Sequence, residues 1–299
     1  MRHKSITFSI AIEKFVEAKR AERLSEHTLV DYKNTFRKFR RYLAGDYPVR
    51  LIKKEAISGF LANTQGVGKK TIRNYHAALS SLWNFLVLQR HVDENIVRLI
   101  KAPRISPKNI EPLSRIDVTQ MLSTVNQREL AMRNRAILLL LLDCGLRASE
   151  LCELQVRDID LTNQHLFVRN GKGGKGRRIP FSEITKIAVE NYMKSRKLTV
   201  NRPSTGIIFQ TTTGNPINRN FLLKMVEKIG FISGVHHCHP HRFRHTFAIQ
   251  FLRNGGNVYT LQALLGHSTL DMVKRYLAIS QIDLERDHIK ASPVVHWGL

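Results

Sequence analysis

The apolar positions of the first hundred residues recur every three or four residues, which is the period of an α-helix that buries one face. One such stretch follows Ser25, a candidate N-cap, and stops at Gly45. Its apolar positions are Leu29, Tyr32, Phe36, Phe39 and Leu43. A second stretch shows the same spacing at Ile72, Tyr75, Leu79, Leu82, Trp83 and Leu86. The pattern predicts a module of four helices over residues 1–101.

The helical period disappears between Lys101 and Pro112, where the sequence is KAPRISPKNIEP. Three prolines in this short segment favour an extended backbone. We therefore predict a linker over residues 102–112 and a second domain over residues 113–299. Two domains joined in this way are able to close around a rod-like partner as a C-shaped clamp.

The second domain begins with a capping-box variant at Ser114–Asp117, which predicts a helix through Leu122. A strongly apolar helix follows and breaks at Gly145. The next helix begins near Arg147, and Glu150 is placed three residues on to pair with that arginine. In isolation, such a pair is usually a solvent-exposed ion pair.

Three short runs with β character come next, at Gln155–Ile159, His165–Arg169 and Arg177–Phe181. The glycine-rich turn NGKGGKG at 170–176 predicts a hairpin loop between the last two runs. The turn also matches the pattern GxGxxG. A dinucleotide site requires a helix after that pattern, whereas the strand-like RRIP follows here, so we exclude a dinucleotide site.

The remaining pattern predicts helices over 182–197 and 218–229, separated by a short strand, GIIFQ. The tail after Tyr276 is expected to form one more helix and to extend away after Pro293. The predicted fold is therefore mainly α with a small antiparallel β-sheet, in two domains.

The net charge of the chain indicates the class of its binding partner. The chain has 48 Lys and Arg against 24 Asp and Glu, a net charge of +24, and a pI near 10.4. Such an excess is typical of proteins that bind nucleic acid, although ribosome-like and membrane-surface binders share it. Lys69, Lys70 and Arg73 crowd the start of a predicted helix, where cations oppose the helix dipole. We interpret this cluster as a DNA contact. Any one of these residues taken alone would more often be an ordinary solvent-exposed surface charge.

The cysteines and apolar runs bear on the location of the protein. Three cysteines, Cys144, Cys152 and Cys238, do not make a disulfide framework and favour a reducing cytoplasm. The start of the chain has no apolar segment of secretory length. The longest apolar run, Ala136–Leu142, is too short to cross a bilayer, so we expect no membrane association.

Ionisable and nucleophilic side chains are concentrated between His239 and Tyr276. His241 and Arg244 are three residues apart on a helical pattern and so share a face. His267 follows a Leu-Gly turn. Arginine binds phosphate oxygens, histidine moves protons near neutral pH, and the Tyr276 phenol is a possible covalent nucleophile. This combination predicts attack of a tyrosine on a phosphodiester.

Metal chemistry is the alternative explanation for this histidine-rich segment. The adjacent residues His236 to His239 cannot readily direct their side chains to one tetrahedral point, and a second Cys/His pair at finger spacing is missing. His241 and His245 have the spacing of a metalloprotease helix, but HRFRH lacks the glutamate. We therefore expect neither a metal nor a cofactor.

Five ordered motifs resemble the tyrosine recombinase, or phage-integrase, family. They are CGLRASEL at 144–151, GKGGKGRRIP at 171–180, HRFRHTFA at 241–248, LLGHS at 264–268, and Tyr276 nine residues after His267. The helical module and proline linker resemble the SAM-like core-binding domain and hinge of the family. The sequence begins directly at the helical module, so we expect no arm-binding domain of the kind found in some phage integrases. In this respect the chain resembles the shorter Xer-type or transposon-borne members.

The resemblance implies a role for each matching residue. Arg147 and Arg244 hold the scissile phosphate. His241 and His267 assist in its activation and in proton transfer, and Tyr276 is the nucleophile.

Further matches complete this implied site. Lys172 corresponds to the hairpin lysine that protonates the leaving 5′ oxygen, with Lys175 as the less favoured candidate. At the tip of the predicted hairpin, Lys175 is also expected to contact DNA. Glu150 corresponds to a supporting position beside the first arginine. The residues after Tyr276 are LAI, where many relatives have a Thr-His pair. The covalent 3′-phosphotyrosine would store the bond energy, so that neither ATP nor a metal is required.

The predicted function is site-specific recombination of duplex DNA that carries short inverted repeats. We expect a dimer on each site and a tetrameric synapse. Two alternatives are a type IB topoisomerase-like nicking-closing enzyme and a catalytically silent DNA-binding regulator of the same fold. Chromosome resolution, phage integration and movement of a mobile element all remain open as biological roles.

Overall fold

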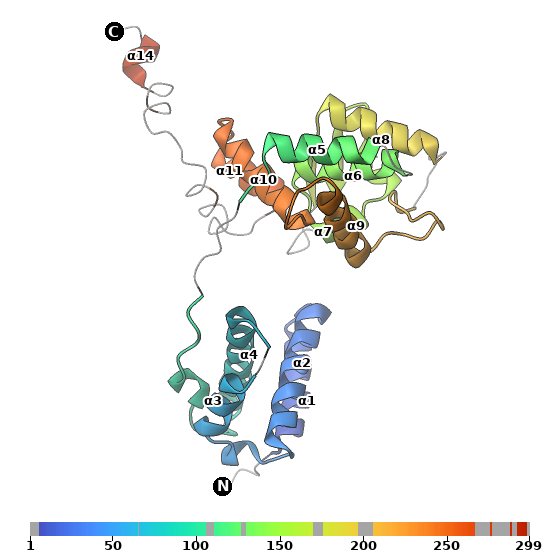
Figure 1. Cartoon of the computed structure of the whole chain (residues 1–299). Helices are drawn as coiled ribbons and strands as arrows, with labels where there is room; N and C mark the ends of the chain where they lie inside the picture. Colours follow the sequence, from blue (N-terminus) through green and yellow to red (C-terminus); the bar gives the residue numbers. More distant parts are fainter. Residues whose placement is uncertain are drawn as a thin grey trace. The chain divides into compact units, whose positions relative to one another are not determined.

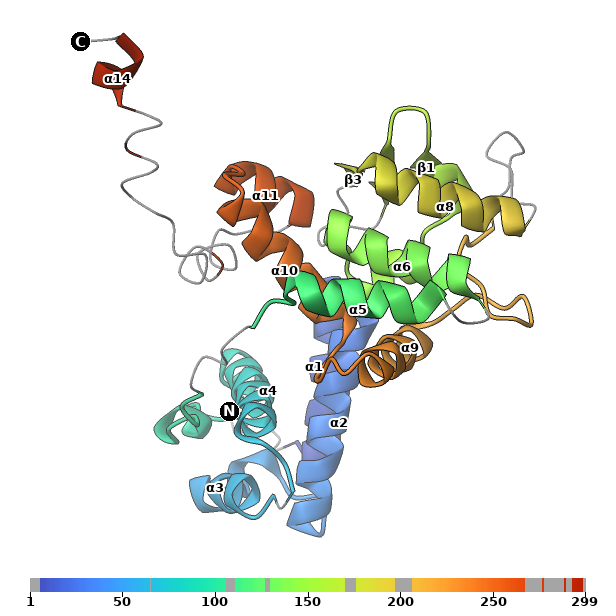
Figure 2. The same cartoon turned by 45° about the horizontal axis from the view of Figure 1, so that its top comes forward.

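The computed structural model describes residues 6–64, 66–105, 111–126, 130–169, 176–196, 206–266, 276, 288 and 292–297. The chain divides into two compact units, Met1–Lys108 and Asn109–Leu299. Each unit has its own secondary-structure elements (Figures 1 and 2). Each also has its own apolar core.

The first unit is helical. Its elements are α1 Phe8–Ala21, α2 Glu26–Leu43, α3 Lys54–Ala62 and α4 Lys69–Leu88, with 3₁₀ turns at Val49–Leu51 and Ile96–Leu99. Four α-helices were predicted for this region, and the prediction is confirmed. The core is aromatic: Phe8 packs against Phe36, Phe39 and Trp83, with edge-to-face geometry to both phenylalanines.

The ends of α2 show how local sequence sets a helix. The Ser25 hydroxyl accepts a hydrogen bond from the Thr28 backbone N–H, as expected of an N-cap. At the other end, Ala44 and not Gly45 takes the left-handed conformation, with φ 55°. The helix therefore ends at Leu43, the last apolar position of the predicted stretch, and Ala44 is its C-cap.

The second unit combines helices with one small sheet. Its helices are α5 Arg115–Asn126, α6 Ala131–Cys144, α7 Ala148–Cys152, α8 Glu183–Ser195, α9 Arg219–Ile232, α10 Pro240–Arg253, α11 Val258–Leu265 and α14 Pro293–Trp297, with a 3₁₀ turn at Val156–Asp158. The strands β1 Ile159–Asp160, β2 His165–Val168 and β3 Arg177–Pro180 form an antiparallel sheet in the order β1-β2-β3. The predicted fold class, mainly α with a small antiparallel sheet, is confirmed.

Helix α6 forms the centre of this unit. It is buried along most of its length because its apolar residues are continuous, and it packs against α5, α8 and α10 (Figure 2). The sheet adds Leu166, which pairs with Ile159 on one side and Ile179 on the other, and all three side chains are buried. None of the helices in the described ranges combines the length and apolarity needed to cross a bilayer.

Three predicted elements are wrong in detail. The run predicted as a strand over Gln155–Ile159 is strand only at Ile159, the first residue of β1. Gln155 forms an isolated bridge to Ile207, and a 3₁₀ turn follows it because Asp158 accepts the Gln155 backbone N–H. The GIIFQ segment likewise forms only isolated bridges. Pro293 starts the short helix α14 instead of an extended tail, because proline is well tolerated at a first helical position.

Two leucines of α4 provide a test of the first core. Leu79 is fully buried, whereas Leu88 is 77% exposed on the same helix. Leu79→Ala should lower the free energy of unfolding by about 2–5 kcal/mol, because it leaves a cavity. Leu88→Ala should change it by less than about 0.5 kcal/mol. Urea unfolding followed by the fluorescence of the buried Trp83 measures both, and equal losses would contradict the described core.

Candidate active site

Arg147 is positioned by the turn between α6 and α7. Gly145 has φ 58°, and a Cβ there would lie 2.4 Å from the Phe247 ring of α10, so both the conformation and the space require glycine. Arg147 is the N-cap of α7, and its backbone N–H donates to Glu150 Oε2 at 2.8 Å. Its Nη1 donates to Glu150 Oε1 at 2.7 Å, which forms the pair predicted from the spacing.

Arg244 comes from the second turn of α10 and points into the protein, with 2% of the side chain exposed. Its Nη1 donates to the Gly145 carbonyl at 2.6 Å, and its Nη2 donates to the Leu265 carbonyl at 2.7 Å. Burial and the nearby Arg147 charge lower its pKa to about 10, against the opposing effect of Glu150. The guanidinium remains charged at neutral pH.

Arg177 on β3 is a third arginine in the same network, although the sequence pattern predicted only a strand at this position. Its Nη1 and Nη2 donate to Glu150 Oε1 and Oε2 at 2.9 and 2.8 Å. Its Nε donates to the Leu264 carbonyl at 2.6 Å. Strand alternation was an available signal, because Arg177 shares a face with the buried Ile179.

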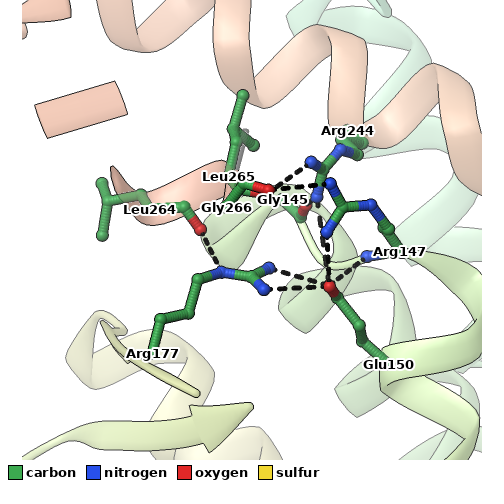
Figure 3. A network of polar contacts seen from close by, with 8 residues as sticks. All are labelled: Gly145, Arg147, Glu150, Arg177, Arg244, Leu264, Leu265 and Gly266. Carbon is green, nitrogen blue, oxygen red and sulfur yellow. Dashed lines mark hydrogen bonds and ion pairs between the residues drawn. The ribbon is translucent and has the colours of Figure 1, made fainter. Parts of the chain in front are cut away.

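The end of α11 is where the three arginines meet (Figure 3). The successive carbonyls of Leu264, Leu265 and Gly266 accept hydrogen bonds from Arg177, Arg244 and Arg147, respectively, the last at 3.2 Å. The last carbonyls of a helix have no partners within it and carry partial negative charge. The guanidinium groups therefore cap the helix electrostatically.

Glu150 is the counter-charge of this network. Its side chain is only 5% exposed, and burial alone would raise its pKa. Hydrogen bonds from Arg177 and Arg147 outweigh that effect and lower the pKa from 4.5 to about 2. Among the described residues, one carboxylate thus faces three guanidinium groups, so these four side chains carry two net positive charges.

Tyr276 lies beside α10, with 1% of the residue exposed. Its ring belongs to an apolar cluster with Ala248, Ile249, Leu252, Leu261 and Leu265. Its hydroxyl is 2.8 Å from His245 Nδ1. Burial lowers the pKa of His245 to about 4, and His241, His239 and Arg244 act in the same direction, so this imidazole is neutral.

His245 was considered in the sequence only as a metal ligand, and its contact with Tyr276 was missed. The i,i+4 spacing from His241 was the available signal, because the two rings are 5.2 Å apart between centroids. His241 itself is exposed, while Arg244 three residues on is buried. The two therefore differ in exposure although they lie close on one helix.

The remaining predicted site residues fall into two groups. Lys69, Lys70 and Arg73 are exposed at the start of α4, in the first unit. His267, Lys172 and Lys175 fall outside the described residues. Within the described ranges, no three His, Cys, Asp or Glu side chains are grouped as a metal site would require.

Comparison with known proteins identifies the class to which this helical unit and this arginine-rich α+β unit belong. Residues 112–281 match the phage integrase family, and residues 12–90 match the phage integrase N-terminal SAM-like domain. The chain belongs to the phage integrase family. It is a tyrosine recombinase, an enzyme that cuts and rejoins DNA at specific sites.

The relatives match along most of the chain. Tyrosine recombinase XerC of Bacillus licheniformis is 30% identical and covers 95% of this chain and 96% of its own length. XerC of Bacillus subtilis is 29% identical, with 94% and 96% covered. The Tn1549 transposon integrase bound to transposon right end DNA has the same fold, with a TM-score of 0.77, 21% identity, and 96% of this chain and 99% of that chain covered.

The low pKa of Glu150 predicts a pH-dependent stability. Because the folded-state pKa lies below the unfolded value of 4.5, the stabilisation is present above pH 4.5 and is lost as the pH falls toward 2. Glu150→Gln should therefore lower the free energy of unfolding by about 3 kcal/mol at pH 7 and by progressively less below pH 4.5. Denaturant unfolding across this pH range measures the difference.

Glu153→Gln is the matched control, because Glu153 is exposed directly after α7. It should leave the stability within about 0.5 kcal/mol of wild type. A Glu150→Gln effect that stays constant between pH 7 and pH 3 would contradict the assigned ion-pair network.

Proposed function

We propose that Tyr276 is the nucleophile of this recombinase and that Arg147 and Arg244 bind the scissile phosphate of duplex DNA. The observation that carries the proposal is the convergence of both arginines on one helix end, with the Tyr276 hydroxyl held by His245 on the same helix as Arg244. Arg147 and its acceptor Gly266 are 119 residues apart in the sequence. A purely structural role does not require this combination of distant groups.

The two arginines are suited to transition-state stabilisation. Attack on a phosphodiester increases the negative charge on the nonbridging oxygens, and preplaced guanidinium groups counter it without a metal. Arg147 is the more accessible, with 26% of its side chain exposed. We propose that it contacts the phosphate from the solvent side, while the buried Arg244 supplies a fixed charge behind it.

The bond changes balance as follows. The Tyr276 oxygen forms a bond to phosphorus while the bond from phosphorus to the 5′ oxygen breaks, and Lys172 gives the leaving oxygen a proton. The phenolic proton passes to the neutral His245, with His241 beside it at the surface. An incoming phosphate anion favours the protonated imidazole and raises its pKa. His267 assists at the phosphate, as the family resemblance implies.

The proposed substrate is duplex DNA with short inverted repeats, around which the two domains, 1–101 and 113–299, close. A dimer on each site and a tetrameric synapse are proposed because strand exchange joins two duplexes. The relatives support this: lambda integrase has been solved as a dimer bound to a core site and as a tetramer bound to a Holliday junction. The buried thiols of Cys144, Cys152 and Cys238 support action in the reducing cytoplasm.

The covalent intermediate is tested with a nicked duplex that contains the natural site, identified from inverted repeats beside the gene. Loss of the short 5′-hydroxyl fragment traps the protein on the DNA as a denaturation-resistant adduct. Wild type should form this adduct, and Tyr276→Phe should form none, because the attacking oxygen is missing. Denaturing gel electrophoresis measures both.

Tyr259→Phe is the matched control, because Tyr259 is 69% exposed on α11; it should form the adduct normally. An adduct that survives Tyr276→Phe would refute the assignment. DNA binding without any adduct would favour the silent regulator, and relaxation of supercoiled DNA that lacks repeats would favour the topoisomerase.

Lys69, Lys70 and Arg73 are proposed as phosphate contacts of the first unit. Replacing all three with glutamine should weaken DNA binding and flatten the dependence of log affinity on log salt by about 0.9 for each phosphate that is no longer neutralised. Cleavage of DNA that is already bound should stay within about threefold of wild type, because these residues do not act on the transition state. An unchanged salt slope in gel-shift titrations would remove them from the interface.

A further inference from the structure

We infer that Arg177 is a positioning residue that fixes the two phosphate-binding arginines by holding Glu150 and the end of α11, an inference that rests on the proposed function. Arg177 lies on β3 and is not among the residues assigned above to the DNA. It donates to both oxygens of Glu150 and to the Leu264 carbonyl (Figure 3).

The first consequence is a fixed carboxylate. The two parallel hydrogen bonds from Arg177 lock the plane of Glu150, because a guanidinium presents its donors as a rigid fork. Glu150 in turn accepts from both the backbone N–H and the Nη1 of Arg147. Arg177 thus determines the direction of Arg147 through a carboxylate that would otherwise be able to rotate.

The second consequence concerns the end of α11. Arg177 Nε binds the Leu264 carbonyl, and a Cβ on Gly266 would lie 3.0 Å from Arg177 Nη1, so the side chain packs closely under this turn. The next two carbonyls are the acceptors of Arg244 and Arg147. A shift of the turn would therefore move the anchors of both arginines.

The third consequence is a competition for charge. Glu150 is shared between Arg177 and Arg147, and Arg244 Nη1 lies 4.0 Å from it. Without Arg177, the carboxylate is free to pair with Arg147 through both oxygens and to neutralise the arginine that the phosphate needs. The loss should therefore appear in the chemical step more than in DNA binding.

Arg177 differs from the two phosphate-binding arginines in its pairing with Glu150. Both Nη atoms of Arg177 donate to that carboxylate, whereas Arg147 gives it one Nη and Arg244 Nη1 lies 4.0 Å from it. The Nε of Arg177 already donates to the Leu264 carbonyl. We therefore assign it to positioning and not to the catalytic set.

The experiment separates binding from cleavage. Arg177→Met retains most of the side-chain length but removes every donor. It should slow adduct formation on saturating nicked duplex by about 100-fold, the scale expected when a reacting group is misplaced. The Kd for DNA should change by less than about threefold, because affinity is spread over many phosphate contacts. Single-turnover adduct formation and gel-shift titration measure the two quantities.

Arg178→Met is the matched control, because Arg178 is the next residue on β3 and is exposed on the other face of the strand. It removes the same charge and should leave the cleavage rate within about threefold of wild type. Arg177→Lys provides a variant that keeps the charge near Glu150. Lysine is a point charge without a planar fork, so this variant should still be at least about tenfold slow.

A double-mutant cycle tests whether Arg177 acts through Glu150. If Arg177 acts through Glu150, the double variant Arg177→Met/Glu150→Gln should be no slower than the slower single variant. The inference would be overturned if the rate loss of the double variant equalled the product of the two single losses. It would also be overturned if Arg177→Lys cleaved at the wild-type rate, or if Arg177→Met changed only the Kd for DNA. Failure of wild type to form a Tyr276-dependent adduct would overturn the proposed function and this inference with it. A normal wild-type adduct with an equally fast Arg177→Met variant would overturn the inference alone.

Discussion

The carboxylate of Glu150 lies among three guanidinium groups at the end of α11, and the geometry of the candidate site depends on this single buried charge. Three arginines placed so close together would repel one another strongly in a poorly solvated position. One carboxylate and three carbonyls offset that repulsion, and the four charged groups of this described cluster still sum to a positive charge. The arrangement that makes the cluster tolerable in the folded protein also suits it to the proposed binding of a phosphate.

The scaffold explains why the arginines stay in place. Arg147 follows a turn that only glycine allows, at the end of the buried helix α6, and Arg244 lies on α10, which packs directly on α6. Arg177 lies on β3, and Ile179, two residues on in the same strand, is buried in the same core as α6. Close packing resists small displacements, so the precision of the site derives from an apolar core that takes no part in the chemistry.

Tyr276 is held differently from the arginines. Its ring is buried in a small apolar cluster between α10 and α11, and a hydrogen bond with His245 holds the hydroxyl. In the proposed mechanism, Tyr276, which is 1% exposed, has to move or its surroundings have to open before its hydroxyl reaches a phosphate in DNA. Under that proposal, the closely packed arginine cluster binds the phosphate and the separately held tyrosine is delivered to it.

The sequence alone determined the helical elements, the caps at Ser25 and Ser114, the glycine break before Arg147, and the family, because these depend on local spacing and on motifs in a fixed order. It also indicated the pair of Arg147 with Glu150, because residues three apart on one helix turn are neighbours in any fold. Only the tertiary structure decided that Arg177 and His245 belong to the site. Their partners Glu150, Leu264 and Tyr276 are 27 to 87 residues away, and no local rule relates side chains at such separations. The strand predicted from Gln155 is interrupted for two reasons: a long-range bridge to Ile207, which no local rule predicts, and a local hydrogen bond from the Gln155 backbone N–H to Asp158, which favours a 3₁₀ turn.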